Sequence, residues 1–466
     1  MSNKKIGIIG LVMINLIAID SLRNIPLTAP AGLYILALYI AAVLLFFIPC
    51  AIAVGELTCK WPVMGGLSVW VDQAFGPNAS FFVVWLQWIY NLTWFPSITA
   101  FAATHLAYGW AFTAQNNFVP LTTSPAFITI LCIILFWSAT LINCFGIRPA
   151  SILSGIGTVA GTLIPMTLII ALGITWIIMG NQINLFSASF SCDHGSVMGL
   201  FVVVLFSLMG LEMASAHAGA VNNPQKNYPR ALWLTVLVVP LSLILSNLAI
   251  GLVIPPNQIN PRAGLIDSFV IFFNAFKMPW MSGIIAFSLF IGAFGAIGTW
   301  SFGLSRYLNK ISERGYLPKI FAKTNKNNVS KNALILQGII VTILSFLYLW
   351  MPNVETAYWY LSCLTAQLAL IAYIIFFIAA IKLRIKNTWD KQKEYVFGPT
   401  WVSVSFYALG IIGCSIGLFA GFVLPGDTSM PLWKFNVMLA LGIIITCTIP
   451  VIVMIVKKAR IKKNVC

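Results

Sequence analysis

The chain has 466 residues, of which 60% are hydrophobic and 8% are charged. An average soluble domain carries roughly 25% charged residues, so this composition excludes an ordinary soluble protein and indicates an integral membrane protein. The formal net charge of +16 does not indicate a nucleic-acid partner, because the basic residues gather on one side of the hydrophobic segments.

The hydrophobic segments have the length of membrane-spanning helices. A span needs about 20 apolar residues to cross about 30 Å of hydrocarbon, and about twelve such stretches follow one another along the chain. We therefore predict an all-α membrane protein with about twelve transmembrane helices. The predicted spans cover residues 6–32, 34–57, 79–110, 126–146, 150–179, 196–220, 231–254, 282–305, 333–351, 356–381, 401–424 and 434–456.

The first and sixth predicted spans contain residues that do not suit a helix facing lipid. Asp20, Arg23 and Pro26 interrupt the first span, and Gly210 and Glu212 interrupt the sixth. Lipid cannot hydrogen-bond a freed backbone group, so broken helices and charged residues persist at membrane depth only where they face a cavity or other protein. Two broken spans are typical of transporters with an inverted repeat and a central substrate site.

The order of the spans predicts one transmembrane transporter domain over residues 1–466. Spans one to five (about 6–180) and six to ten (about 196–382) have similar lengths, and an odd number of spans gives the two units opposite orientations. The last two spans (about 400–457) lie outside this repeat. Residues 257–280 are too polar to cross the membrane, and we expect them to form a short helix along the outer surface.

The distribution of positive charge predicts the orientation. With the N-terminus in the cytoplasm, all lysines and arginines lie on that side except Arg23, Arg262, Lys277 and Lys434. This asymmetry follows the positive-inside rule and predicts contact with anionic lipid. Residues 1–19 lack a small-residue cleavage site, so we expect a retained first span. The prediction is a multi-pass protein of the cell (inner) membrane with both termini cytoplasmic.

The residue types that usually bind metals or catalyse reactions are not arranged here in a recognisable motif. The nine cysteines and three histidines lack metal-ligand or redox spacing, so no metal and no cofactor is expected. A nucleophile with its base, or a phosphate-binding loop, is likewise not recognisable, so an enzyme is not expected. The sequence indicates a lipid bilayer and small molecules as partners, no nucleic acid, and no particular oligomeric state.

The segment after the second span has two interpretations. Residues 55–66 mix turn residues with apolar ones, which suits a connection that dips toward a substrate pathway. The alternative is an ordinary loop in which Glu56 faces cytoplasmic water.

The two breaks predict where a substrate binds. A half-helix exposes positively polarised N–H groups at its N-terminus and negatively polarised carbonyls at its C-terminus, which suit the carboxylate and the ammonium of an amino acid. Two tryptophans, in the third and eighth spans, are expected as walls or gates. The predicted substrate-binding residues are Ser21, Leu22, Arg23, Asn24, Ile25, Trp94, Phe206, Leu208, Met209, Gly210, Glu212, Met213 and Trp300.

Several of these residues also have a structural interpretation. Arg23 could be neutralised locally by Asp20, or could face the cavity and attract a substrate carboxylate. Glu212 could pair with Arg23, or could act as a protonatable gate for proton coupling. Aromatic residues in a bundle usually pack against neighbouring helices, and the same holds for Trp94 and Trp300.

The sequence resembles the amino acid-polyamine-organocation transporters, and within them the bacterial glutamate/γ-aminobutyrate antiporter family. The strongest match is Phe206–Ala231, FSLMGLEMASAHAGAVNNPQKNYPRA, with the pattern residues Gly210, Glu212, Ala214, Asn223, Pro224, Tyr228 and Pro229. Further matches are Ile254–Gly264, Thr299–Leu308 and Leu317–Asn327. The resemblance implies a twelve-helix fold and amino acid exchange by alternating access.

Three features depart from that family. This chain ends at Cys466, so we do not expect the longer C-terminal segment that closes the cytoplasmic path in acid-resistance exchangers. Gly155 stands where some relatives place a lysine instead of a bound sodium ion. The first break, at residues 21–26, differs from the Gly-rich break of many members.

These observations predict an amino acid antiporter of the glutamate/γ-aminobutyrate type or for a related amino acid and amine pair. The alternative is a proton-coupled permease for neutral amino acids, with Glu212 carrying the proton. A channel or a sensor on the same scaffold is less well supported, because no span carries a ring of like charges and no signalling domain is recognisable.

Overall fold

The computed structural model describes residues 7–19, 21–61, 66–114, 124–146, 155–184, 194–213, 215, 221–327, 329–386, 389, 394–423 and 430–465. Every element of regular secondary structure in these ranges is a helix, as predicted. The elements before the second break are α1 (Ile8–Ile19), η1 (Leu22–Asn24), α2 (Ile25–Thr28), η2 (Ala29–Ala31), α3 (Tyr34–Ala42), η3 (Val43–Phe47), α4 (Ile48–Lys60), α5 (Leu67–Phe75), α6 (Pro77–Ala114), α8 (Pro125–Cys144), η4 (Val159–Leu163), α10 (Ile164–Ile178) and α11 (His194–Ser207). Those after it are α12 (Pro224–Val253), η7 (Pro256–Gln258), α13 (Gly264–Ala275), α14 (Met281–Glu313), η8 (Lys319–Phe321), α15 (Lys331–Ser345), α16 (Leu347–Trp350), α17 (Val354–Lys386), α18 (Thr400–Ala420) and α19 (Leu432–Val465).

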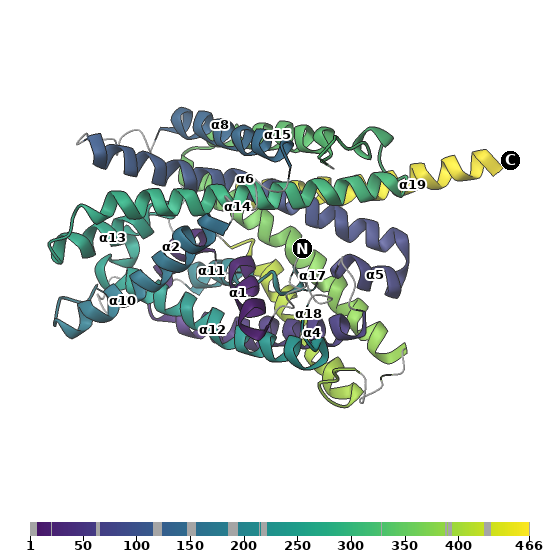
Figure 1. The fold of residues 1–466 in the computed structure, drawn as a ribbon, viewed down its shortest axis with the longest axis horizontal. Coiled ribbons are helices and arrows are strands. Elements are labelled where there is room, and N and C mark those ends of the chain that lie inside the picture. Colours follow the sequence, from purple (N-terminus) through teal and green to yellow (C-terminus); the bar gives the residue numbers. More distant parts are fainter. Residues whose placement is uncertain are drawn as a thin grey trace.

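Long helices run along one axis of the molecule. Helices α6, α8, α14 and α15 lie side by side along the long axis of Figure 1, with α13 near one end of the bundle and α5 near the other. Within the described ranges, nine helical segments are long and apolar enough to cross a membrane. The prediction of twelve spans and of an inverted repeat stays a prediction.

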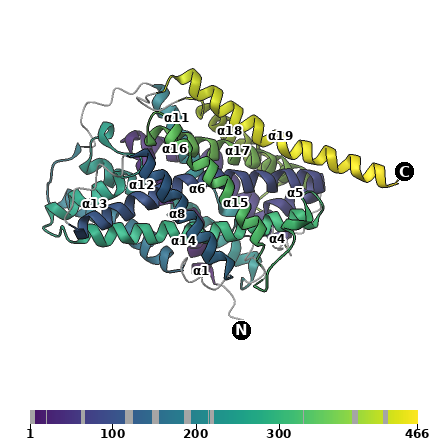
Figure 2. The same ribbon diagram turned by 90° about the horizontal axis from the view of Figure 1, so that it is seen from above.

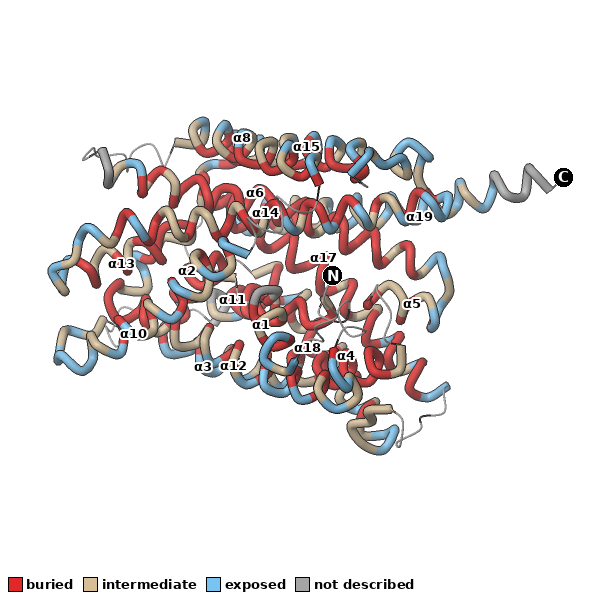
Figure 3. The backbone as a smooth tube through the Cα atoms, viewed as in Figure 1, coloured by how far each residue is buried: buried red, intermediate tan, exposed pale blue. Residues whose placement is uncertain are grey.

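Helix α6 is the centre of the bundle. It has 38 residues and packs against α14, α17, α5 and α8. Figure 3 shows α6 and α17 as largely buried, while exposed residues follow the outward turns of α8 and α15. Polar residues such as Gln87 and Asn91 are buried in α6, and they are tolerated because other helices shield α6 from lipid.

Helix α19 shows the opposite environment. It lies along one edge in Figure 2 and reaches beyond the other helices. Only 11% of its most apolar 18-residue stretch is buried, and Leu441, Ile444 and Ile445 are exposed. A long helix with such apolar exposed side chains is suited to contact with lipid tails.

Two short helices flank the long ones. Helix α5 was not predicted; it lies between the connection at residues 55–66 and the third predicted span. Helix α13 confirms the predicted short helix in residues 257–280, but it does not simply lie on a surface: Phe269, Phe272 and Phe273 are fully buried. Helix α13 packs against α12, α14, α10 and α2, and so caps the bundle at that end.

Of the two interpretations of the segment after the second span, the one in which Glu56 faces water is wrong. Glu56 lies inside α4 and is fully buried. Its carboxylate accepts hydrogen bonds from the Phe397 N–H (2.9 Å), the Ser403 hydroxyl (3.0 Å) and the Tyr407 hydroxyl (2.5 Å), and lies 3.5 Å from Arg384. A buried carboxylate is tolerated when its oxygens are satisfied in this way, and Glu56 therefore joins α4 to α17 and α18.

Candidate functional site

The first predicted break is present. Helix α1 ends at Ile19, Ser21 is extended (φ −107°, ψ 102°), and the chain continues through the short helices η1 and α2. Pro26 lies in the first turn of α2, where its missing N–H does not remove a helical hydrogen bond. The N–H groups at the start of this second half-helix are directed toward the interruption.

The second break is present as well. Helix α11 ends at Ser207, residues 209 and 210 are not helical, and Leu211–Met213 form one turn of 3-10 helix. Gly210 has φ +124°, a backbone conformation that glycine adopts without steric cost. Its N–H donates to the Tyr373 hydroxyl (3.0 Å) on α17, so the break is anchored to a neighbouring helix.

The two breaks line one cavity. Its empty space, which includes the solvent at its mouth, is about 1140 Å³. The walls come from both breaks and from α6, η4, α14 and α17. The lining residues are Ile19, Ser21, Leu22, Arg23, Asn24, Tyr90, Asn91, Trp94, Ile98, Phe101, Thr158, Gly161, Thr162, Phe206, Met209, Gly210, Glu212, Leu289, Gly292, Ala293, Ala296, Thr299, Trp300 and Ala369.

Most of the predicted substrate-binding residues gather at this cavity. Those that line it are Ser21, Leu22, Arg23, Asn24, Trp94, Phe206, Met209, Gly210, Glu212 and Trp300. Ile25 and Leu208 are fully buried and, like Met213, do not line the cavity. They follow or precede lining residues in short helical turns, which direct neighbouring side chains to different sides. That the lining residues bind substrate stays a prediction.

Arg23 is held by neutral partners. Its side chain is 1% exposed, and it donates to the Ser97 hydroxyl (2.8 Å), the Ser362 hydroxyl (3.0 Å) and the Asn24 side-chain oxygen (2.8 Å). Its guanidinium also lies 5.6 Å from the centre of the Tyr358 ring. Asp20, the partner considered from the sequence, lies outside the described residues.

Glu212 does not pair with Arg23, so that alternative is wrong. Glu212 is 4% exposed, and its carboxylate accepts a short hydrogen bond from the Tyr373 hydroxyl. The same hydroxyl accepts from the N–H of Gly210. Tyr373 therefore connects the carboxylate and the backbone of the second break, a role that the sequence did not reveal.

Aromatic residues form one wall of the cavity. Trp94 on α6 and Trp300 on α14 have ring centres 6.1 Å apart at an angle of 64°, an edge-to-face arrangement that aromatic pairs favour. Both line the cavity, so their packing against each other and their position at a wall are compatible.

The sequence analysis missed the wall formed by η4 and α14. Thr158 and Thr162 line the cavity beside Gly161, which lies against Gly292 of α14 so closely that a Cβ on Gly292 would be 2.7 Å from the Gly161 Cα. The Gly-rich pattern of the eighth span was the available signal. Gly155, which the resemblance aligned with a lysine of some relatives, does not line the cavity.

The connection before α5 reaches the second break. A Cβ on Gly66 would be 2.6 Å from the Ser215 side-chain oxygen and 3.1 Å from the Glu212 carbonyl. Residues 62–65, the rest of the segment predicted to dip toward the pathway, lie outside the described residues. In the described part of the chain, no three His, Cys, Asp or Glu side chains gather closely enough to hold a metal ion.

Comparisons with known proteins show which family the chain resembles. The family model described as amino acid permease matches residues 6–449. The chain is 38% identical over 454 residues to an uncharacterized transporter of Legionella pneumophila, covering 96% of each chain. It is 27% identical over 463 residues to a glutamate/gamma-aminobutyrate antiporter of Lactococcus lactis, covering 97% of this chain and 91% of the relative.

Two further matches extend the comparison. The chain is 26% identical over 390 residues to a probable agmatine/putrescine antiporter of Lactococcus lactis, covering 82% of this chain and 80% of that protein. Among solved structures, it is similar to MhsT in complex with L-phenylalanine, with a TM-score of 0.57, 13% identity, and coverage of 92% of this chain and 98% of the other. At that identity the likeness shows the fold alone.

Proposed function

The chain belongs to the amino acid permease family of membrane transporters, and from this premise we propose that it exchanges amino acids across the bacterial inner membrane by alternating access. The observation that carries the proposal is that both helix breaks line one cavity. A transporter with broken helices binds its substrate where the half-helix ends converge. The family consists of transporters rather than enzymes.

In this proposal the backbone of the breaks recognises the amino acid. The N–H groups of η1 donate hydrogen bonds to its carboxylate, and the carbonyls at the end of α11 accept hydrogen bonds from its ammonium. Arg23 and Glu212 set the charge of the cavity, while Trp94 and Trp300 contact the side chain of the substrate.

Exchange is favoured over uptake by the similarity to proteins named as antiporters. The glutamate and γ-aminobutyrate pair is the first pair to test, followed by other amino acids and amines. Both termini are proposed to be cytoplasmic, because the basic residues gather on that side of the predicted spans.

Counterflow into liposomes tests the proposal. The purified protein is reconstituted into liposomes loaded with one unlabelled amino acid or amine, and uptake of labelled candidates is followed. We expect at least one loaded compound to accelerate uptake over empty liposomes. If no combination from the full panel accelerates uptake, the exchange proposal is wrong.

Matched glycine variants identify the site that carries the flux. Gly210 and Gly315 both have positive φ, 124° and 75°, so alanine strains the backbone at either position. Gly210 lines the cavity, whereas Gly315 follows α14 and does not. We expect Gly210→Ala to lose most of the counterflow and Gly315→Ala to keep it.

A proton-coupled permease is the second candidate. The buried carboxylate of Glu212 at the cavity wall favours it, because such a group can exchange a proton during the transport cycle. This candidate predicts uptake into empty liposomes driven by a pH gradient, with loss of that response in Glu212→Gln. If the protein exchanges amino acids but shows no uptake driven by a pH gradient, the proton-coupled permease is rejected.

A further inference from the structure

Two buried arginines connect the same pair of helices. Arg23, from the first break, donates to Ser97 on α6 at 2.8 Å and to Ser362 on α17 at 3.0 Å. Its side chain lies at the cavity. This crosslink, here called the inner rung, joins the first break to two long helices.

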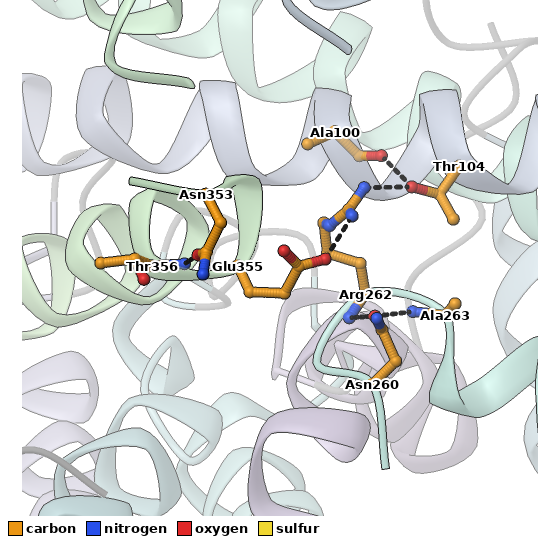
Figure 4. Close-up of polar contacts among 8 residues, drawn as sticks. All are labelled: Ala100, Thr104, Asn260, Arg262, Ala263, Asn353, Glu355 and Thr356. Carbon is orange, nitrogen blue, oxygen red and sulfur yellow. Dashed lines mark hydrogen bonds and ion pairs between the residues drawn. The ribbon is translucent and has the colours of Figure 1, made fainter. Parts of the chain in front are cut away.

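Arg262 forms a second crosslink of the same kind. It lies before α13, is 2% exposed, and donates to the Thr104 hydroxyl on α6 (3.1 Å) and to Glu355 on α17 (2.6 Å). Figure 4 shows the guanidinium directed at both partners. We call this crosslink the outer rung.

The spacing of the partners makes the two rungs parallel. Thr104 follows Ser97 by seven residues on α6, and Ser362 follows Glu355 by seven residues on α17. Seven residues are two helical turns, which return to the same helix face after a rise of roughly 10 Å. The rungs are therefore stacked along the interface between α6 and α17.

The outer rung lies on the α13 side of the cavity. Ile98 and Phe101 both line the cavity, and on α6 they lie between Ser97 and Thr104. Along α6, the outer rung therefore lies beyond these cavity residues, toward α13.

Local contacts hold Arg262 in this position. The side-chain oxygen of Asn260 accepts from the N–H groups of Arg262 (2.9 Å) and Ala263 (3.0 Å), which fixes the turn before α13. One turn beyond Thr104 on α6, the hydroxyl of Tyr108 donates to Asp267 of α13 at 2.7 Å. The connection and α13 are thus attached to α6 at two successive turns.

The acidic partner is also well placed. Glu355 lies in the first turn of α17, where the helix dipole favours a negative charge. The side chain of Asn353 accepts from the N–H of Thr356 and caps the same turn. The ion pair therefore joins the turn before α13 to the first turn of α17. Its arginine is largely shielded from water.

We infer that Arg262, Thr104 and Glu355 form an outer closure of the transport pathway, which has to open before a substrate from outside reaches Arg23. Arg262 acts here as a positioning residue: it attaches the connection before α13 to α6 and α17 and does not touch the substrate. The inference rests on the proposed transport function and on the proposed orientation, in which α13 faces the outside.

Thiol labelling tests the closure without requiring a known substrate. Cysteine at Ile98, between the two rungs, is exposed to a membrane-impermeant thiol reagent added outside intact cells, with the parent protein as background. In Arg262→Ala and Glu355→Gln we expect labelling at least about tenfold faster, since a shielded and hydrogen-bonded ion pair can shift an equilibrium by that factor. Thr104→Val, which removes one partner and keeps the ion pair, should give a smaller increase.

Two controls separate closure from a general loss of folding. The exchanged pair Arg262→Glu with Glu355→Arg should label more slowly than either single reversal. Arg314→Ala removes a solvent-exposed pair with Asp72 at 3.6 Å near the opposite end of the bundle, and it should label at the unmodified rate. A variant that is merely misfolded would not be restored by the exchanged pair.

The outcomes are distinguishable. Unchanged external labelling in folded Arg262→Ala, Glu355→Gln and Thr104→Val would overturn the inference. If labelling accelerates but no amino acid is exchanged in liposomes, the closure stands and the proposed substrate class is wrong. If exchange occurs and labelling does not change, the proposed function stands and the closure is rejected.

Discussion

At the scale of single residues, the Tyr373 hydroxyl has two partners in the second break. It donates to Glu212 and accepts from the N–H of Gly210. Tyr373→Phe removes both hydrogen bonds without changing the shape of the ring. We expect thermal unfolding measurements in detergent to show a loss of about 1–3 kcal/mol, together with slower counterflow, because the break loses its anchor on α17.

A second variant gives the matched control for Tyr373→Phe. Tyr360 is also on α17, but its hydroxyl donates to the carbonyl of Met438 on α19, away from the cavity. Tyr360→Phe should lower stability by a similar amount and leave counterflow unchanged. In a double-mutant cycle, Glu212→Gln and Tyr373→Phe should be less than additive; fully additive effects would show that the hydrogen bond is not important for transport.

Glu56 permits another prediction at this scale. Because its carboxylate satisfies three donors and lies beside the buried Arg384, Glu56→Ala leaves a buried cation without its counter-charge. We expect a loss of about 3–5 kcal/mol in unfolding measurements. Glu394→Ala is the control: its pair with Lys60 is more exposed, and we expect a loss of about 0.2–1 kcal/mol. Equal effects would contradict the prediction.

At the scale of secondary-structure elements, the contact between η4 and α14 depends on glycine. A Cβ on Gly292 would lie 2.7 Å from the Gly161 Cα, whereas a Cβ on Gly298 or Gly303 of the same helix meets nothing within 4 Å. Gly292→Ala should therefore separate the two elements and destabilise the protein by about 1–3 kcal/mol. It should also change the cavity, which both Gly161 and Gly292 line.

The neighbouring glycines make the comparison internal to one helix. Alanine is the better helix former by roughly 0.5–1 kcal/mol, so Gly298→Ala and Gly303→Ala should be neutral or slightly stabilising. Thermal unfolding and counterflow of the three variants would be measured together. If all three variants have the same stability and the same counterflow, helix propensity determines the change, and the close contact between η4 and α14 does not.

The elements also show which predictions the sequence supports. The breaks were predictable, because Pro26, Gly210 and two charged residues conflict locally with a helix in lipid. The partners of Arg23 were not, since Ser97 and Ser362 are ordinary residues whose importance arises only from the packing of α6 and α17. The buried position of Glu56 was not predictable for the same reason, because its hydrogen-bond donors lie more than 300 positions away in the chain.

At the scale of the whole molecule, hydropathy predicted most of the long helices. Its predictions were wrong or incomplete where tertiary packing determines the structure. Helix α6 continues to Ala114 although its polar residues lower its hydropathy, because the bundle and not lipid surrounds it. Helix α5 was missed because only tertiary contacts with α6 and α17 distinguish it from a loop. The cavity wall formed by η4 and α14 likewise follows from assembly of the bundle.

The orientation of the whole molecule permits a last prediction. Positive residues at the two ends of the bundle are unequal: Lys277 and Arg262, which is paired with Glu355, lie by α13, whereas Lys310, Arg314 and Lys319 lie at the far end of α14. By the positive-inside rule, we expect the α13 end to face outside. Single cysteines replacing Lys277 and Lys319 would be tested with an impermeant thiol reagent on intact and on permeabilised cells. We expect Lys277→Cys to react in both and Lys319→Cys only after permeabilisation, because the membrane shields the cytoplasmic end. The reverse pattern would invert the orientation and would place Arg262 and Glu355 at the cytoplasmic end of the pathway.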